Sequence, residues 1–244
     1  MSSESSSQIE SVLQEERVFA PSPELASKSR VPSLVAYEQM VEKANTDPDS
    51  FWGDLARQEL HWFAPFQKVL DWSNPPFAKW FEGGKTNISF NCLDRHLDKP
   101  TADKDALIWE GEIGDVRRYT YRELHLEVSR TANALKEIGI KKGDLVALYM
   151  PMIPEAAIAM LACGRIGAVH SVVFGGFAAN ELASRIDDSK AKLIVSASCG
   201  YEPGRTVHYK PLVNKALELA NHKPDKCIIF QREKDKAELN PSMD

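Results

Sequence analysis

The stretch from Leu145 to Ala197 constrains the fold most, because three short apolar runs alternate there with two segments of helical spacing. Apolar runs without polar alternation are typical of strands that are buried on both faces of a sheet. Strands and helices in such close succession predict right-handed crossovers and a parallel sheet. The predicted strands are Leu145–Met150, Ala168–Phe174 and Lys192–Ala197, and the predicted helices are Glu155–Ile166 and Ala179–Asp188.

Proline and glycine mark where these elements begin and end. Pro151 and Pro154 cannot donate to a strand ladder, and Pro154 suits the first turn of a helix. Gly167 is placed to end that helix, and Gly175-Gly176 interrupts the apolar run that follows it. Because ligands of parallel sheets bind beyond the carboxyl ends of the strands, Gly175 and Gly176 are predicted to lie at a binding edge.

The rest of the chain predicts further elements around this sheet. Aromatic residues crowd the irregular, proline-containing stretch 61–81, a density typical of a segment that wraps onto a larger body. Further predicted helices are Tyr37–Ala44, Asp49–Leu60, Asn87–His96, 121–138 and Leu212–Ala220, and further strands are Ala106–Glu110, Val116–Thr120 and Cys227–Phe230. The predicted fold class is α/β: a parallel sheet of βαβ units preceded by an aromatic-rich wrapping segment.

The bulk composition excludes several classes of protein. A net charge of −5 over 244 residues offers no basic excess for coating nucleic acid. The cysteines stand singly, which supports neither a zinc site nor a disulfide framework and favours buried, reduced thiols. The N-terminus lacks a secretory signal, and no apolar segment is long and uncharged enough to span a bilayer. We therefore expect a cytoplasmic protein without a nucleic-acid or membrane partner. The four cysteines are Cys92, Cys163, Cys199 and Cys227.

The common catalytic and phosphate-binding motifs do not occur. Gly84-Lys85-Thr86 lacks the earlier glycine of a phosphate loop, because Lys79 stands at that position. No dinucleotide fingerprint, nucleophile elbow or zinc-protease motif is found. His170 lies within a predicted strand and is interpreted as a core histidine rather than as a base. Residue patterns therefore predict no catalytic residue and no metal site, and they leave the chemistry open.

Several motifs, taken in order, resemble the acetyl-coenzyme A synthetase family. Trp80-Phe-Glu-Gly-Gly, Asn87 and Asn91-Cys-Leu-Asp-Arg-His-Leu97 resemble its N-terminal signature. The resemblance covers about Tyr37 to Arg232, and between Gly200 and Lys226 it is closer to the propionate-type branch of these short-chain enzymes. Five further stretches follow in the family's order: Thr120–Leu124, Lys142–Asp144, Tyr149–Pro154, Leu161–Ser171 and Phe174–Phe177.

The resemblance implies an AMP-forming acid–thiol ligase. Such an enzyme activates acetate or propionate with ATP and Mg²⁺ to an acyl-adenylate, releases pyrophosphate, and transfers the acyl group to coenzyme A. Its partners are these small molecules. The implied domains are a mobile tail at 1–30, an acetyl-CoA synthetase N-terminal wrapping segment at 31–97, the first part of an AMP-binding α/β domain at 98–232, and a polar tail at 233–244.

The resemblance also implies a coenzyme A site. Gly175 and Gly176 would lie along the pantetheine arm, although a plain turn explains the two glycines equally well. The segment Glu202-Pro203-Gly204-Arg205 matches the one that meets the nucleotide phosphates of coenzyme A. Arg205 suits phosphate because its guanidinium is permanently charged and bidentate, whereas many acetate enzymes carry arginine in place of Glu202. The alternative for Arg205 is an ordinary surface arginine, because Ser198–Arg205, which follows the predicted strand Lys192–Ala197, is predicted to be a loop.

The segments that carry adenylation in this family are not found in the sequence. The Thr/Ser/Gly-rich phosphate loop, the acyl pocket and the domain with the adenylating lysine have no counterpart here. We therefore expect an inactive N-terminal fragment of an acetate–CoA ligase. The alternatives are a fragment of a propionate–CoA ligase and a stand-alone, non-catalytic module that binds coenzyme A or a partner.

Overall fold

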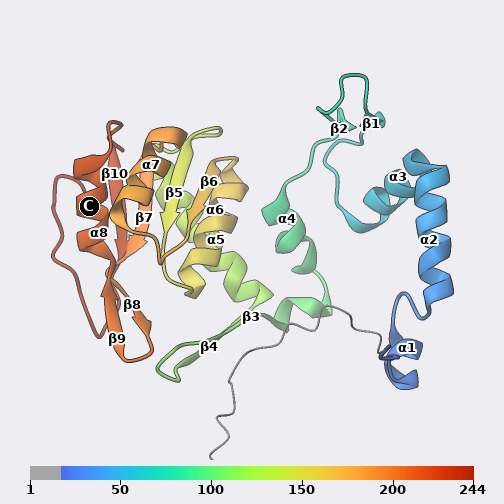
Figure 1. Ribbon diagram of the computed structural model, residues 1–244, viewed down its shortest axis with the longest axis horizontal. Helices are drawn as coiled ribbons and strands as arrows, with labels where there is room; N and C mark the ends of the chain where they lie inside the picture. Colours follow the sequence, from blue (N-terminus) through green and yellow to red (C-terminus); the bar gives the residue numbers. More distant parts are fainter. Residues whose placement is uncertain (1–17) are drawn as a thin grey trace, which may run out of the picture. The chain divides into compact units, whose positions relative to one another are not determined.

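The structure is a computed structural model that describes residues 18–244, so most of the predicted tail at 1–30 lies outside the described residues. The chain divides into two compact units with a boundary between Gln58 and Glu59, and each is described by itself. Both are drawn in Figure 1. Within residues 18–244, no helix combines the length and the apolar character that crossing a bilayer requires.

The first unit is helical. The two helices predicted here are confirmed, and each begins at a polar cap: Ser33 accepts from the Ala36 N–H, and Asp47 accepts from the Ser50 N–H at 3.1 Å. A further short helix lies in the segment that we predicted to be a tail. The helices are α1 (Pro23–Lys28), α2 (Leu34–Thr46) and α3 (Pro48–Glu59).

The second unit begins with a small hairpin where we predicted irregular chain. Strands β1 (Lys68–Asp71) and β2 (Lys79–Glu82) pair antiparallel, so that prediction was wrong for these residues. The strands are only four residues long and do not alternate apolar and polar residues, which hides them from a periodicity test. The rings of Trp62, Phe66 and Phe81 pack within 5.0–5.6 Å of one another beside this hairpin.

The segment after the hairpin is attached to the α/β body by polar side chains. The predicted helix at 87–96 is two pieces, because Leu93 leaves helical geometry between α4 (Ile88–Cys92) and the 3₁₀ turn η1 (Asp94–His96). Asn87 caps α4 and donates from Nδ2 to the Gly164 carbonyl at 2.8 Å. Asp94 accepts two hydrogen bonds from Arg165, at 2.7 and 2.8 Å.

The α/β fold class is confirmed by a four-stranded parallel sheet with the order β10-β7-β5-β6. A separate antiparallel pair precedes it, and Thr120 with Glu123 forms the capping box that begins α5. The sheet strands are β5 (Leu145–Tyr149), β6 (Val169–Val173), β7 (Leu193–Ala197) and β10 (Lys226–Phe230). The antiparallel pair is β3 (Asp105–Glu110) and β4 (Val116–Thr120), and the 3₁₀ turn η2 (Pro100–Asp103) precedes it.

Helices cover both faces of the sheet (Figure 1). Successive side chains of β5 point to opposite faces, so Val146 and Leu148 pack under α5 and α6, whereas Ala147 and Tyr149 pack under α7 and α8. This double burial explains the uninterrupted apolar runs of the sequence. The four helices are α5 (Tyr121–Glu137), α6 (Pro154–Ile166), α7 (Ala179–Ser189) and α8 (Tyr209–Leu219).

The edge strand β6 is less buried than its apolar sequence indicates. His170 is exposed, so its interpretation as a core histidine was wrong, and Val169 and Val172 are 51% and 59% exposed. The cause is the position of β6, which pairs with β5 on one side and, within residues 18–244, with no strand on the other. The thiols of Cys163, Cys199 and Cys227 are buried as predicted, but Cys92 is exposed.

Candidate functional site

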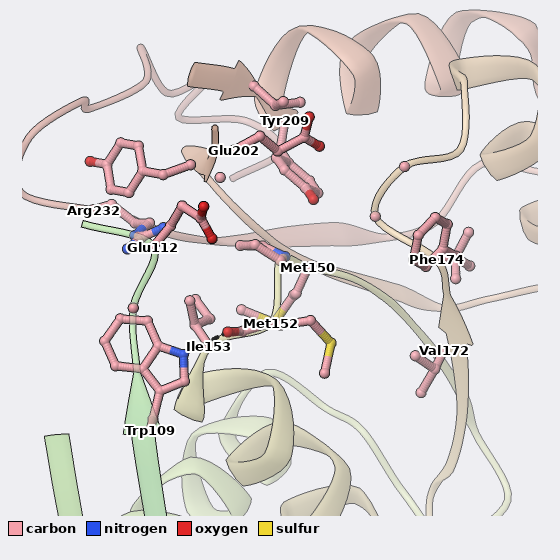
Figure 2. A pocket seen from close by; sticks show the side chains of 18 of the residues that line it. Trp109, Glu112, Met150, Met152, Ile153, Val172, Phe174, Glu202, Tyr209 and Arg232 are labelled. Atoms are coloured by element: carbon pink, nitrogen blue, oxygen red, sulfur yellow. Dashed lines mark hydrogen bonds between the residues drawn. The ribbon is translucent and has the colours of Figure 1, made fainter. Parts of the chain in front are cut away.

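A pocket of about 390 Å³ opens at the carboxyl edge of the sheet (Figure 2). We call it the glycine pocket, because Gly175 and Gly176 after β6 and Gly200 in β8 form part of its wall. Apolar side chains such as Met150 and Val172 line much of the remainder. The sequence prediction that Gly175 and Gly176 lie at this edge is therefore confirmed as a placement.

Gly175 is required by its neighbours in the fold. A Cβ atom at this position would lie 2.2 Å from the Tyr209 hydroxyl and 3.0 Å from the Met150 carbonyl oxygen. Gly200 packs on the same ring, since its Cβ would lie 2.9 Å from a carbon of Tyr209. Two glycines, one in the turn after β6 and one on β8, thus make room for one buried tyrosine. Gly176 is exposed, and its backbone faces the pocket without such a constraint from another element.

Tyr209, which lines the pocket, packs against a second buried tyrosine. Its ring centroid lies 5.0 Å from that of Tyr149, whose hydroxyl donates to the Phe177 carbonyl at 2.6 Å. Burial, together with the nearby Tyr149 and Glu202, raises the pKa of Tyr209 to about 12. The Tyr209 phenol is therefore neutral at physiological pH and acts as a packing group. The pair holds the turn from Phe174 to Phe177 against the sheet.

The segment predicted as a loop after β7 is a hairpin instead. Strands β8 (Cys199–Glu202) and β9 (Arg205–His208) pair antiparallel, with Pro203 and Gly204 at the turn. Gly204 has a φ of +74°, the left-handed region that glycine adopts without strain. The loop prediction was wrong because Pro and Gly were read as marking an irregular segment, whereas here they form only its two-residue turn.

The hairpin separates the predicted site residues. Glu202 lines the glycine pocket, but Pro203, Gly204 and Arg205 do not. The Arg205 side chain is 70% exposed, and its Nε donates to Glu202 Oε2 at 2.7 Å. The only arginine in this turn is thus paired with the acidic residue beside it.

Residues from distant parts of the sequence complete the wall. Trp109 of β3 donates from Nε1 to the Met152 carbonyl at 2.7 Å, which fixes one side of the pocket. Arg117 lies over the Trp109 ring at 4.8 Å and binds Glu155 with two hydrogen bonds, at 2.6 and 2.8 Å. Arg232 lies two residues beyond β10 and also lines the pocket.

Sequence reasoning missed Trp109, Tyr209 and Arg232. Arg232 was within reach, because the carboxyl-edge rule that located Gly175 applies equally to the predicted strand Cys227–Phe230. Trp109 and Tyr209 carried no signal in the sequence, because their position depends on how an antiparallel hairpin and a helix end meet the sheet. The structure thus brings Gly175, Gly176 and Glu202 together with groups that the sequence does not connect to them.

The site has the composition of a binding pocket. Its acidic side chains are Glu110, Glu112 and Glu202, and its basic side chain is Arg232. Within residues 18–244, no group of three or more His, Cys, Asp or Glu side chains is arranged to hold a metal ion. A pocket with apolar walls and backbone exposed at Gly176 accommodates a thin, largely uncharged chain.

Comparisons with known proteins find similar proteins over nearly the whole chain. The family model described as "AMP-binding enzyme" matches residues 93–243, and the model "Acetyl-coenzyme A synthetase N-terminus" matches residues 37–92. An acetyl-coenzyme A synthetase of Methylobacillus flagellatus is 50% identical over 239 residues, 98% of this chain and 36% of the relative. Those of Pasteurella multocida and Deinococcus radiodurans are 49% and 50% identical over 91% and 87% of this chain. The chain spans about a third of the length of these relatives, covering 36%, 34% and 32% of them.

Proposed function

The chain belongs to the family of AMP-binding enzymes, and we propose that it is the N-terminal part of an AMP-forming acetate–CoA ligase. The observation that carries the proposal is the joint match of two adjoining family models, which together cover residues 37–243. Identity of about 50% with acetyl-coenzyme A synthetases along most of the chain supports acetate as the acid. The motifs that resembled this family on sequence grounds lie within the matched residues.

In the proposed reaction, an acetate oxygen attacks the α-phosphorus of ATP and pyrophosphate leaves. The thiol of coenzyme A, after losing its proton, then attacks the carbonyl carbon of acetyl-adenylate, and AMP leaves with the bonding electron pair. We assign this chain a role in the second step. The glycine pocket binds the arm of coenzyme A, with the backbone at Gly175 and Gly176 alongside it. The apolar wall and the neutral phenol of Tyr209 suit an uncharged arm.

The nucleotide end of coenzyme A is proposed to meet the hairpin turn Glu202-Pro203-Gly204-Arg205. The exposure of Arg205 supports this, because a guanidinium at the surface is accessible to phosphate. The ion pair with Glu202 opposes it, since phosphate must compete with a carboxylate already in place. We therefore propose that Glu202 weakens the phosphate contact that Arg205 makes.

ATP and Mg²⁺ belong to the first step. The described residues offer no cluster of ligands for the metal ion, so we assign Mg²⁺ no ligand in this chain and derive no step through it. We propose that the protein works in the cytoplasm on small molecules alone, with no nucleic-acid or membrane partner; the four unpaired cysteines support a reducing compartment. We also propose the domain boundaries 1–30, 31–97, 98–232 and 233–244 given above.

The test is an assay of the full-length protein that contains this chain. We expect acetate-dependent exchange of pyrophosphate into ATP, and acetyl-CoA formation only when coenzyme A is added. Propionate serves as the competing acid, and kcat/KM should be higher for acetate. A higher value for propionate would move the protein to the propionate branch, and the absence of exchange with either acid would overturn the ligase.

A further inference from the structure

One wall of the glycine pocket is the segment that connects β5 to α6, residues Met150 to Ile153, which we call the connecting wall. Its first end is fixed at the sheet, because the Ser196 hydroxyl donates to the Tyr149 carbonyl at 2.6 Å. In its middle, Met152 is 89% exposed, so the packing of its side chain does not hold the backbone there. A contact from another part of the chain holds the Met152 backbone instead.

Trp109 of β3 makes that contact. Its Nε1 donates to the Met152 carbonyl at 2.7 Å, and Figure 2 shows the indole across the pocket from Phe174. Strands β3 and β4 form a sheet of their own, separate from the four-stranded sheet. Side-chain contacts, rather than a shared strand ladder, therefore join this hairpin to the connecting wall.

Arg117 of β4 fixes the orientation of the indole. It lies directly opposite Trp109 in the antiparallel register, and its guanidinium lies over the indole ring at 4.8 Å. The same guanidinium donates from Nη1 and Nη2 to the two carboxylate oxygens of Glu155, at 2.6 and 2.8 Å. A bidentate pair fixes the plane of a guanidinium, so the ring stacked on it is restrained as well.

Glu155 connects this arrangement to the far end of the connecting wall. It lies in the first turn of α6, directly after Pro154, where the helix dipole favours a negative charge. Its side chain is 19% exposed and that of Arg117 is 35% exposed, so solvent screens the pair less than a surface pair. Arg117 thus acts on the wall at two places: at Met152 through Trp109, and at the start of α6 through Glu155.

We propose that Arg117 is a positioning residue for acyl transfer to coenzyme A. Through Trp109 and Glu155 it holds the connecting wall where the arm of coenzyme A packs in the glycine pocket. The inference rests on the proposed function, which places the arm in this pocket. Because a misplacement of reacting groups by about 1 Å costs about 100-fold in rate, a displaced wall is expected to slow transfer to the thiol. Formation of acetyl-adenylate does not use the arm and should not depend on Arg117.

The test is steady-state kinetics of the full-length protein that contains this chain. Arg117→Gln should lower kcat/KM for coenzyme A about 10- to 100-fold, the effect of a displacement of about 1 Å or less. Acetate-dependent exchange of pyrophosphate, measured without coenzyme A, should be unchanged. Arg117→Lys keeps the charge but not the planar fork, so its loss should be smaller than that of Arg117→Gln. Arg118→Gln changes the next residue of β4, which is paired with Asp105 at the surface, and should have no effect.

A second comparison tests whether Arg117 acts through Trp109. Trp109→Phe keeps an aromatic ring and removes the N–H that binds Met152, so it should also lower kcat/KM for coenzyme A. Arg117→Gln should then cost less in the Trp109→Phe background than in the unchanged protein, because the two changes interrupt the same contact. Fully additive losses would overturn the inference.

Gly176→Leu separates a failure of the inference from a failure of the proposed function. It adds a side chain where the backbone lines the pocket, so it should raise the KM for coenzyme A if the arm lies there. If Gly176→Leu raises that KM and Arg117→Gln leaves the kinetics unchanged, the inference is wrong and the proposed coenzyme A site stands. If Gly176→Leu has no effect, the pocket does not bind the arm, and both are overturned. Equal losses of pyrophosphate exchange and acyl transfer in Arg117→Gln would give Arg117 a purely structural role and would also overturn the inference.

Discussion

Arg205 and Glu202 face each other across the turn of the β8–β9 hairpin, with Nε of the arginine 2.7 Å from Oε2 of the glutamate. The two side chains are 70% and 42% exposed, so the pair is solvated and weakly stabilising. Its consequence concerns binding: the single positive charge of the turn is partly neutralised before any phosphate arrives.

The first prediction is that Glu202→Gln lowers the KM for coenzyme A in the full-length enzyme, and that Arg205→Ala raises it. A hydrogen bond to a charged group is worth about 1.5–3 kcal/mol, so the loss in Arg205→Ala should be about 10-fold or more. Steady-state kinetics with varied coenzyme A measures both. Glu218→Gln, which breaks a similarly exposed pair with Lys215 on α8, is the control. Equal losses in pyrophosphate exchange without coenzyme A would instead give Arg205 a structural role.

The second prediction concerns Gly175. Its replacement by alanine places a Cβ 2.2 Å from the Tyr209 hydroxyl, so the chain should lose about 1–3 kcal/mol of unfolding free energy. Tyr209→Phe removes that oxygen and should recover part of the loss in the double variant. Urea unfolding of the four proteins in the cycle measures the coupling. Additive effects of the two substitutions would show that the contact is not what requires glycine.

The third prediction is a pH dependence that originates at Asp94. Burial raises the pKa of Asp94, but the hydrogen bonds and charge of Arg165, with the nearby His125, outweigh it and lower the net pKa below its ordinary value of 3.8. A carboxyl with a lowered folded pKa stabilises the fold above its unfolded pKa, and this stabilisation is lost as pH falls through the folded value. Asp94→Asn should therefore lower the free energy of unfolding at pH 7. The same substitution should make that free energy fall less on acidification.

Urea unfolding from pH 7 down to pH 3 checks this difference. At pH 7, Asp94→Asn should lower the free energy of unfolding by about 2 kcal/mol, because it breaks the partly buried ion pair with Arg165. Asp105→Asn breaks the exposed pair with Arg118 and should cost about 1 kcal/mol or less. If Asp94→Asn and the unchanged chain lost stability in parallel on acidification, Asp94 would not be the titrating group.

The fourth prediction concerns the edge strand β6. Val169 is 51% exposed on β6, whose outer edge pairs with no strand of the described part of the chain. An unpaired strand edge promotes self-association. Val169→Lys should reduce self-association and binding of a hydrophobic dye, with little change in unfolding free energy. Leu126→Lys on α5 replaces a residue that is 47% exposed on a helix, and it should leave self-association unchanged. Light scattering at several protein concentrations compares the two variants.

The parts of the fold that were predictable depend on local pattern. The parallel strands β5, β6, β7 and β10 were readable because each is a short apolar run bounded by turn residues. The helices between them were readable from an apolar face and from the proline or glycine at an end. The β1–β2 and β8–β9 hairpins were not, because four-residue strands carry too few residues for a period to show. His170 was misassigned because the sequence of a strand does not state whether it lies at the edge of its sheet.

The site was predictable only as far as the carboxyl-edge rule reaches. It placed Gly175 and Gly176 correctly, and it applies to Arg232 as well. It says nothing about Trp109, which reaches the pocket from a separate hairpin, or about the pairing of Arg205 with Glu202. The position of Trp109 arises from tertiary packing, and the pairing of Arg205 with Glu202 arises from the two-residue turn that joins β8 to β9.

The most direct test of the account compares the chain alone with a chimaera, in which it replaces the matching N-terminal residues of the Methylobacillus flagellatus relative. The chain alone should release no pyrophosphate from ATP in the presence of acetate and Mg²⁺ above a blank without protein, because it lacks the preorganised groups that adenylation needs. The chimaera should form acetyl-CoA. Turnover by the chain alone would contradict the account, and so would a cooperatively folded chimaera that exchanges pyrophosphate but transfers no acetyl group to coenzyme A.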